Sequence, residues 1–108
     1  MMAASKVDDR NFKQEVLDAK VPVLVDFWAP WCGPCRMMGG VVEELSDDLE
    51  GRAKVVKVNV DEAPEAAAQF GVQSIPAFKV FHEGEVRGQQ VGVVPKQSLL
   101  DLVEPRVN

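Results

Sequence analysis

Two cysteines dominate the chemistry that this 108-residue sequence can perform. Both lie in the run Trp-Cys-Gly-Pro-Cys at residues 31–35, as Cys32 and Cys35. Thiols this close can form a disulfide and open it again without remodelling the chain. As a cross-link the pair would be weak, because closing a four-residue loop contributes about 2 kcal/mol, against about 3 kcal/mol for fifteen residues. The spacing therefore favours thiol–disulfide exchange.

The neighbouring pattern places Cys32 where a thiolate is stabilised. An apolar run at residues 21–28 precedes the cysteines and predicts a buried strand. Beyond them, apolar residues recur every four positions, which predicts a helix: Met37, Val41, Leu45 and Leu49. Cys32 would lie at or near the start of that helix, where unpaired N–H groups and the helix dipole favour the thiolate. We therefore expect Cys32 to attack and Cys35 to resolve the mixed disulfide.

Two other uses of the cysteine pair are possible. The same spacing occurs in zinc sites, but a structural zinc needs four ligands, and the rest of the chain offers His82 and no further cysteine. A purely structural disulfide is the second alternative, and the short loop argues against it. We expect redox chemistry and no metal.

Asp26 is the second candidate for chemistry. It interrupts the apolar run six residues before Cys32, so its carboxylate is expected to lie in the core. Burial raises the pKa of a carboxylate, which suits proton transfer near neutral pH. The alternative is an outward-facing residue of the strand.

The elements needed to position these residues follow an alternating pattern. A helix carrying Phe12 and Val16 comes first, with capping residues at 8–11; after the strand at 21–28 and the helix from Cys32 come further elements of both kinds. These are a strand at 55–60, a helix capped by Asp61 that ends before Gly71, strands at 77–81 and 85–91 joined by a turn at 83–84, and a helix from Pro95 that Pro105 stops. This order predicts a single α/β domain over residues 1–108, a mixed sheet with helices on both faces.

Several motifs in the chain resemble the thioredoxin family. The active-site segment at 28–37 carries the resemblance, which continues through 57–61, 71–76, 81–84 and 91–92, in order and without a large insertion. The resemblance implies the thioredoxin fold and protein disulfide reduction. It also implies regeneration by a thioredoxin reductase, commonly a flavin-containing enzyme that uses NADPH. The chain itself has no dinucleotide fingerprint, so we expect it to hold no cofactor.

The same resemblance assigns roles to individual residues. Asp26 becomes the buried proton acceptor beneath Cys35, with Lys57 beside it. Ile75-Pro76 matches a cis-proline loop packed against the disulfide. A flat docking surface for oxidised proteins is implied for a set of six residues: Trp31, Gly33, Pro34, Ile75, Pro76 and Gly92. Trp28 is expected to belong to the core.

Composition limits the partners. The net charge of −5 would repel nucleic acid, and no apolar run approaches the roughly 20 residues that span a bilayer. Residues 1–6 contain no apolar segment of the kind a signal peptide requires, so we expect the reducing cytoplasm. We also expect a monomer. An oxidase or isomerase and a binding module without redox turnover remain alternatives; Gly-Pro between the cysteines resembles reducing members of the family.

One departure from the family lies in the helix after the cysteines. Thioredoxins usually place a proline where this chain has Gly40, which is preceded by Gly39. Two interior glycines cost about 2 kcal/mol relative to alanine. We expect one helix that continues through both glycines and bends there. Met37 and Met38 are expected to pack in this helix, and His82 to be solvated.

Overall fold

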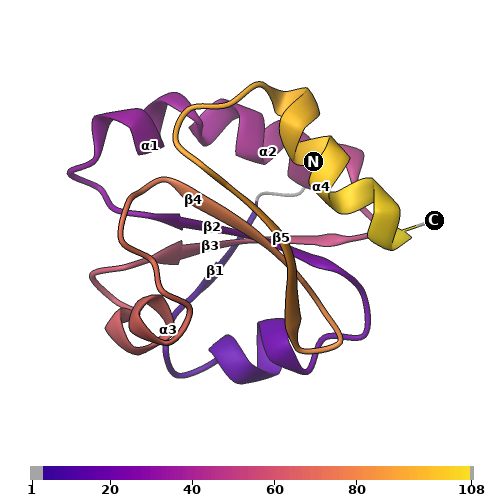
Figure 1. Ribbon diagram of the computed structural model, residues 1–108, viewed down its shortest axis with the longest axis horizontal. Coiled ribbons are helices and arrows are strands. Elements are labelled where there is room, and N and C mark those ends of the chain that lie inside the picture. The colour runs from indigo at the N-terminus through magenta and orange to yellow at the C-terminus, as the bar shows by residue number, and fades with distance from the viewer. Residues whose placement is uncertain (1–3, 108) are drawn as a thin grey trace.

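The computed structural model describes residues 4–107 and is built around a five-stranded sheet. The strands are β1 (Ser5–Val7), β2 (Val23–Trp28), β3 (Lys54–Asn59), β4 (Ala77–His82) and β5 (Glu85–Val91). Their order is β1-β3-β2-β4-β5 (Figure 1). The first three run parallel, β4 is antiparallel to β2, and β5 is antiparallel to β4. The expected mixed sheet is confirmed.

Helices cover both faces of this sheet. They are η1 (Lys13–Leu17), α1 (Gly33–Met37), α2 (Gly39–Asp48), α3 (Pro64–Gln69) and α4 (Lys96–Val107). α1, α2 and α4 lie on one side, and α3 and η1 lie on the other (Figure 1). The loop at 29–32, which includes Cys32, connects β2 to α1 at the carboxyl end of the central parallel strands.

Alternation along the strands divides the core into two layers. Leu24, Phe78 and Val80 pack beneath α2 and α4, against Val42, Leu45, Leu99 and Val103. The residues between them on the strands face η1 and α3; this layer includes Val23, Val25, Phe27, Phe81, Phe12 and Val16. Full burial of one such side chain contributes about 1.5–3 kcal/mol. The loop before α1 is therefore anchored to strands whose two faces are both packed with apolar side chains.

The helix after the cysteines differs from the prediction of one continuous helix bending at the two glycines. Met38 separates α1 from α2 with φ −86° and ψ −8°. Its N–H donates to the carbonyl of Cys35 at 3.2 Å, three residues back, which is a tighter turn than that of an α-helix. The prediction is wrong in this respect: Gly39 and Gly40 form the first turn of α2, and the break precedes them.

This break also decides which methionine is buried. Met37 was expected in the apolar stripe but is 70% exposed, whereas Met38 is 2% exposed and packs in the core. The buried stripe therefore runs through Met38, Val42, Leu45 and Leu49. Its spacing follows the period of about 3.6 residues of an α-helix.

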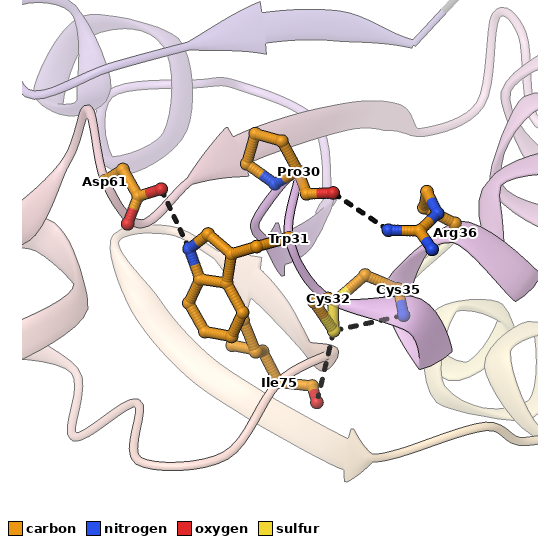
Figure 2. The surroundings of a disulfide bond; sticks show 7 residues. All are labelled: Pro30, Trp31, Cys32, Cys35, Arg36, Asp61 and Ile75. Carbon is orange, nitrogen blue, oxygen red and sulfur yellow. Dashed lines mark hydrogen bonds between the residues drawn. A yellow bond between two sulfur atoms is a disulfide. The ribbon is translucent and has the colours of Figure 1, made fainter.

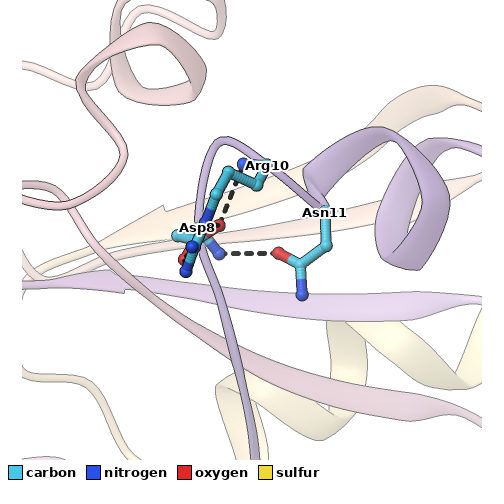
Figure 3. A network of polar contacts seen from close by, with 3 residues as sticks. All are labelled: Asp8, Arg10 and Asn11. Carbon is cyan, nitrogen blue, oxygen red and sulfur yellow. Dashed lines mark hydrogen bonds and ion pairs between the residues drawn. The ribbon is translucent and has the colours of Figure 1, made fainter.

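Two capping predictions are wrong. Asp61 does not cap α3; Asp9 does, and it accepts hydrogen bonds from the N–H groups of Glu65 at 3.0 Å and Ala66 at 2.9 Å. Residues 8–11 do not cap η1, whose first turn has no side-chain cap. Asp8, Arg10 and Asn11 close their own turn instead. Asp8 pairs with Arg10 at 2.7 Å, and the backbone N–H of Asp8 donates to Asn11 Oδ1 at 2.8 Å (Figure 3).

The ends of the chain hold further differences. β1 was not predicted, because Val7 is its one buried residue and three residues show no alternation. Pro105 does not stop α4, which continues to Val107. His82 is half-buried where a solvated side chain was expected. Residues 1–3, which belong to the segment in which no signal peptide was expected, lie outside the described residues.

Candidate redox-active site

Cys32 and Cys35 are joined by a disulfide at the start of α1. Their Cα atoms are 5.3 Å apart, and the residues are 5% and 4% exposed. Cys32 is the N-cap residue, and its Sγ accepts a hydrogen bond from the N–H of Cys35 at 3.2 Å (Figure 2). Pro34 lies in the first turn, where a missing N–H costs nothing. The helix start that the sequence predicted for Cys32 is confirmed.

A second loop packs against this disulfide. The peptide bond between Ile75 and Pro76 is cis, as the resemblance implied. The carbonyl oxygen of Ile75 lies 3.8 Å from Cys32 Sγ (Figure 2). A disulfide sulfur has no proton, so this contact becomes a hydrogen bond when Cys32 is a thiol. Gly92 donates its N–H to the carbonyl of Pro76 at 2.8 Å and has φ +93°, which glycine adopts without strain.

The rim of the site is fixed by two polar contacts that the sequence did not reveal. The indole Nε1 of Trp31 donates to Asp61 Oδ2 at 3.0 Å, although the side chain is exposed (Figure 2). Arg36 donates from Nη1 to the carbonyl of Pro30 at 3.0 Å. Both bonds connect segments on either side of the cysteines. Asp61 had been expected to cap α3, and its side chain holds the tryptophan instead.

Asp26 is buried in β2, as its place in an apolar run predicted. It is 2% exposed, and its Oδ1 has no hydrogen-bond partner among residues 4–107. Burial raises the pKa of this carboxyl from 3.8 to about 7, and the positive charge of Lys57 opposes the rise. A carboxyl with a pKa near 7 can take up and release a proton at neutral pH.

Comparison with known proteins decides the family. The Thioredoxin family profile matches residues 3–105. Thioredoxin 1 of Nostoc sp. is 56% identical over 104 residues, covering 96% of this chain and 97% of its own. Thioredoxin of Synechocystis sp. is 52% identical over the same coverage, and that of Pyropia yezoensis is 51% identical over 91% of this chain and 92% of its own. The chain belongs to the thioredoxin family.

Membership in the thioredoxin family settles the use of the cysteine pair. The protein is a disulfide oxidoreductase, and its redox couple is the disulfide between Cys32 and Cys35. No cluster of three or more His, Cys, Asp or Glu side chains that could hold a metal occurs in residues 4–107. Within the same range no helix is long and apolar enough to cross a membrane.

The other residues that the thioredoxin resemblance singled out differ in their exposure to solvent. Trp31 and Pro34 are exposed, Gly33, Ile75 and Gly92 are half-buried, and Pro76 is buried. Trp28 is half-buried, with the ammonium of Lys57 over its ring at 4.5 Å from the centroid. Asp26 Oδ1 makes no hydrogen bond to either cysteine in this oxidised state.

Proposed function

We propose that reduced Cys32 attacks disulfides of other proteins and that Cys35 completes the exchange. The observation that carries this order is the position of Cys32 Sγ at the N-cap of α1, where it accepts the N–H of Cys35. The same N–H and the helix dipole would stabilise a thiolate on Cys32. Cys35 lies inside the helix and is 4% exposed, which suits a thiol that stays protonated until it is needed.

The exchange proceeds in two balanced steps. The Cys32 thiolate forms a bond to one sulfur of the substrate disulfide, and the other substrate sulfur leaves as a thiolate. Asp26 then accepts the proton of Cys35, through a bridging water or a small movement, because no direct bond joins them. The Cys35 thiolate attacks Cys32 Sγ, the mixed disulfide breaks, and the second substrate sulfur leaves. The protein ends oxidised and the substrate reduced.

Protein substrates would dock on the exposed apolar rim of the site. Among residues 4–107, four of the six exposed large hydrophobic residues lie within two positions of a site residue, which argues for a contact surface. They are Trp31, Met37, Val91 and Val93. Gly33, Pro34, Ile75 and Gly92 add a nearly flat floor, and the backbone beside Pro76 can pair with an extended substrate segment.

The protein would act as a single domain and as a monomer, in the cytoplasm. A thioredoxin reductase that uses NADPH would regenerate the dithiol. A couple that is oxidised at every turnover needs such a donor, and the sequence has no dinucleotide fingerprint of its own.

Insulin reduction tests the cysteine roles. We expect the wild type to reduce insulin with dithiothreitol as electron donor, and Cys32→Ser to be inactive. Cys35→Ser should accumulate covalent mixed disulfides with substrate, whereas Cys32→Ser should accumulate few. Faster alkylation of Cys35 than of Cys32 in the reduced wild type would reverse the assignment.

A further inference from the structure

Lys79 is a buried lysine outside the redox couple. It lies in β4 between Ala77 and Phe81 on the face that η1 and α3 cover, and it is 7% exposed. Lysine is almost never buried unless its charge is compensated. Its burial therefore calls for a partner.

The chain supplies one partner. Lys79 Nζ donates to Gln89 Oε1 at 2.5 Å, across the β4–β5 ladder in which the two residues are paired. An ammonium has three donors. Within residues 4–107 it has no ion pair and no second acceptor. A buried positive charge with two donors left over is complementary to an anion.

A hollow of about 210 Å³ lies beside this ammonium. Its wall is formed by Lys79 and Gln89 together with Val72, Gln73, Ser74 and Val91. Gln73, Ser74 and Val91 are exposed, so the hollow opens to the surface. None of the residues that line the hollow carries a negative charge, so Lys79 is not neutralised from its wall.

The hollow adjoins the site of disulfide exchange. Ser74 immediately precedes Ile75, and Val91 immediately precedes Gly92. Lys79 follows Pro76 by three residues, which is roughly 10 Å along a strand at about 3.3 Å per residue. A substrate segment docked at Ile75 would reach the hollow with a side chain two or three residues from its attacked cysteine.

We propose that this hollow binds a carboxylate of the docked substrate, an aspartate or glutamate side chain, and that Lys79 makes the enzyme prefer substrates that carry one there. The chain has a net charge of −5, so an acidic segment would be repelled by most of its surface and favoured beside a buried ammonium. This inference rests on the proposed docking surface at Ile75 and Gly92. A hydrogen bond from an ammonium to a carboxylate is among the stronger polar contacts.

Single-turnover reduction of matched peptides tests the proposal. Each peptide carries one cysteine, held in a disulfide with free cysteine, and a glutamate at one position two or three residues before or after it; the reference peptide has glutamine at all four. Release of peptide thiol by the reduced protein is measured. At one position we expect glutamate to raise the rate constant about tenfold, which corresponds to about 1.4 kcal/mol. In Lys79→Met, which keeps the aliphatic stem, that preference should vanish.

A control separates local contact from net charge. Lys20→Gln removes one positive charge from an exposed residue before the start of β2, at the end of the strand opposite the cysteines, and should keep the preference. Equal rates for all peptides with the wild type, or an unchanged preference in Lys79→Met, would overturn the proposal. Should Lys79→Met not fold, Lys79→Gln removes the same charge and keeps a polar side chain, and an unchanged preference in that variant would do the same. The glutamine peptide has no carboxylate for Lys79, so its rate of reduction tests the proposed docking surface and exchange chemistry independently of the hollow.

Discussion

Asp26 and Lys57 are direct partners in the β2–β3 ladder, yet their charged groups form no ion pair in the described chain. The ammonium of Lys57 lies over the ring of Trp28, 4.5 Å from its centroid, where a cation–π contact holds it. Lys57 therefore acts on Asp26 through its field alone. The carboxyl keeps a pKa near 7, because burial outweighs the field of Lys57.

Replacement of Asp26 by asparagine should change stability with a defined pH dependence. The pKa of Asp26 is about 7 in the folded protein, against an ordinary value of 3.8. Between these pH values the folded state binds more protons than the unfolded state, so the free energy of unfolding falls as pH rises and levels off above pH 7. Asp26→Asn removes this loss of stability. The free energy of unfolding of the variant should equal that of the wild type near pH 4 and exceed it above pH 7, by at most about 4 kcal/mol.

Urea unfolding at the two ends of this pH range measures the effect. Asp101→Asn, which changes an exposed carboxylate on α4, is the control and should show no such divergence. The same variant tests the proton relay, because Asp26→Asn keeps the size of the side chain and removes the acceptor. Equal rates of disulfide reduction by Asp26→Asn and wild type across neutral and mildly alkaline pH would contradict the relay.

Lys57→Met should move the pH dependence of disulfide reduction to higher pH. The positive charge of Lys57 lowers the pKa of Asp26, and without it the carboxyl holds its proton to higher pH. The pH–rate profile of single-turnover reduction is the measurement. Lys54→Met on the same strand is a suitable control, since Lys54 pairs with Glu15 at 2.6 Å and not with Asp26. Identical shifts in both variants would indicate a general charge effect.

Asp61 should influence substrate binding more than stability. Its carboxylate holds the exposed indole of Trp31 in place on the proposed docking surface. Asp61→Ala removes the acceptor, which should raise KM for protein substrates while the free energy of unfolding changes by less than about 1 kcal/mol. Asp61→Asn keeps an acceptor oxygen and should restore much of the binding. A KM unchanged in Asp61→Ala would show that the indole is positioned by packing alone.

The sequence predicted those features that local pattern controls. The cysteine spacing, the apolar run around Asp26 and the turn at 83–84 each act within a few residues, and the structure has them where they were expected. The cis bond before Pro76 is different, because its prediction came from the family resemblance and not from the residues alone.

Contacts between distant segments could not be predicted in this way. Asp9 caps a helix more than fifty residues away, and Trp31 bonds to Asp61 across thirty residues. Each partner is polar and common, so no local signal distinguishes it from its neighbours. Met37 and Met38 show a related limit: they are chemically identical, and the turn at Met38 decides which one is buried.

The structure has Asp9 as the cap of α3, whereas the sequence pattern predicts Asp61, and the two assignments predict opposite rankings of stability for the alanine variants. Asp9→Ala leaves the N–H groups of Glu65 and Ala66 without their acceptor and should lower the free energy of unfolding by about 1 kcal/mol. Asp61→Ala, at the position where the pattern predicts the cap, should cost less. Chemical denaturation of the two variants compares them directly. A larger loss of stability in Asp61→Ala than in Asp9→Ala would indicate that Asp61 caps α3. Disulfide reduction should be unaffected in Asp9→Ala.

The two glycines that open α2 should be replaceable with a gain in stability. A Cβ atom added at Gly39 or Gly40 would meet no other atom within 4 Å, and neither residue has a positive φ. Gly39→Ala should therefore stabilise the fold by roughly 0.4–1 kcal/mol, because alanine restricts the unfolded chain. Gly40→Pro should gain a similar amount, since N–H groups in the first turn of a helix have no acceptor within it. The preceding glycine also has no Cβ for the proline ring to meet.

Gly51→Ala is the matched control for this gain. Its added Cβ would also meet nothing within 4 Å, but its φ is +84°, so alanine there is strained and should destabilise the protein by about 1 kcal/mol. Thermal unfolding of the three variants shows whether the room around the added atoms or the backbone conformation determines the change in stability. Losses in both Gly39→Ala and Gly40→Pro would show that the turn at Met38 requires glycine after it. A gain in both, with disulfide reduction retained, would show that the turn at Met38 does not depend on the two glycines that follow it.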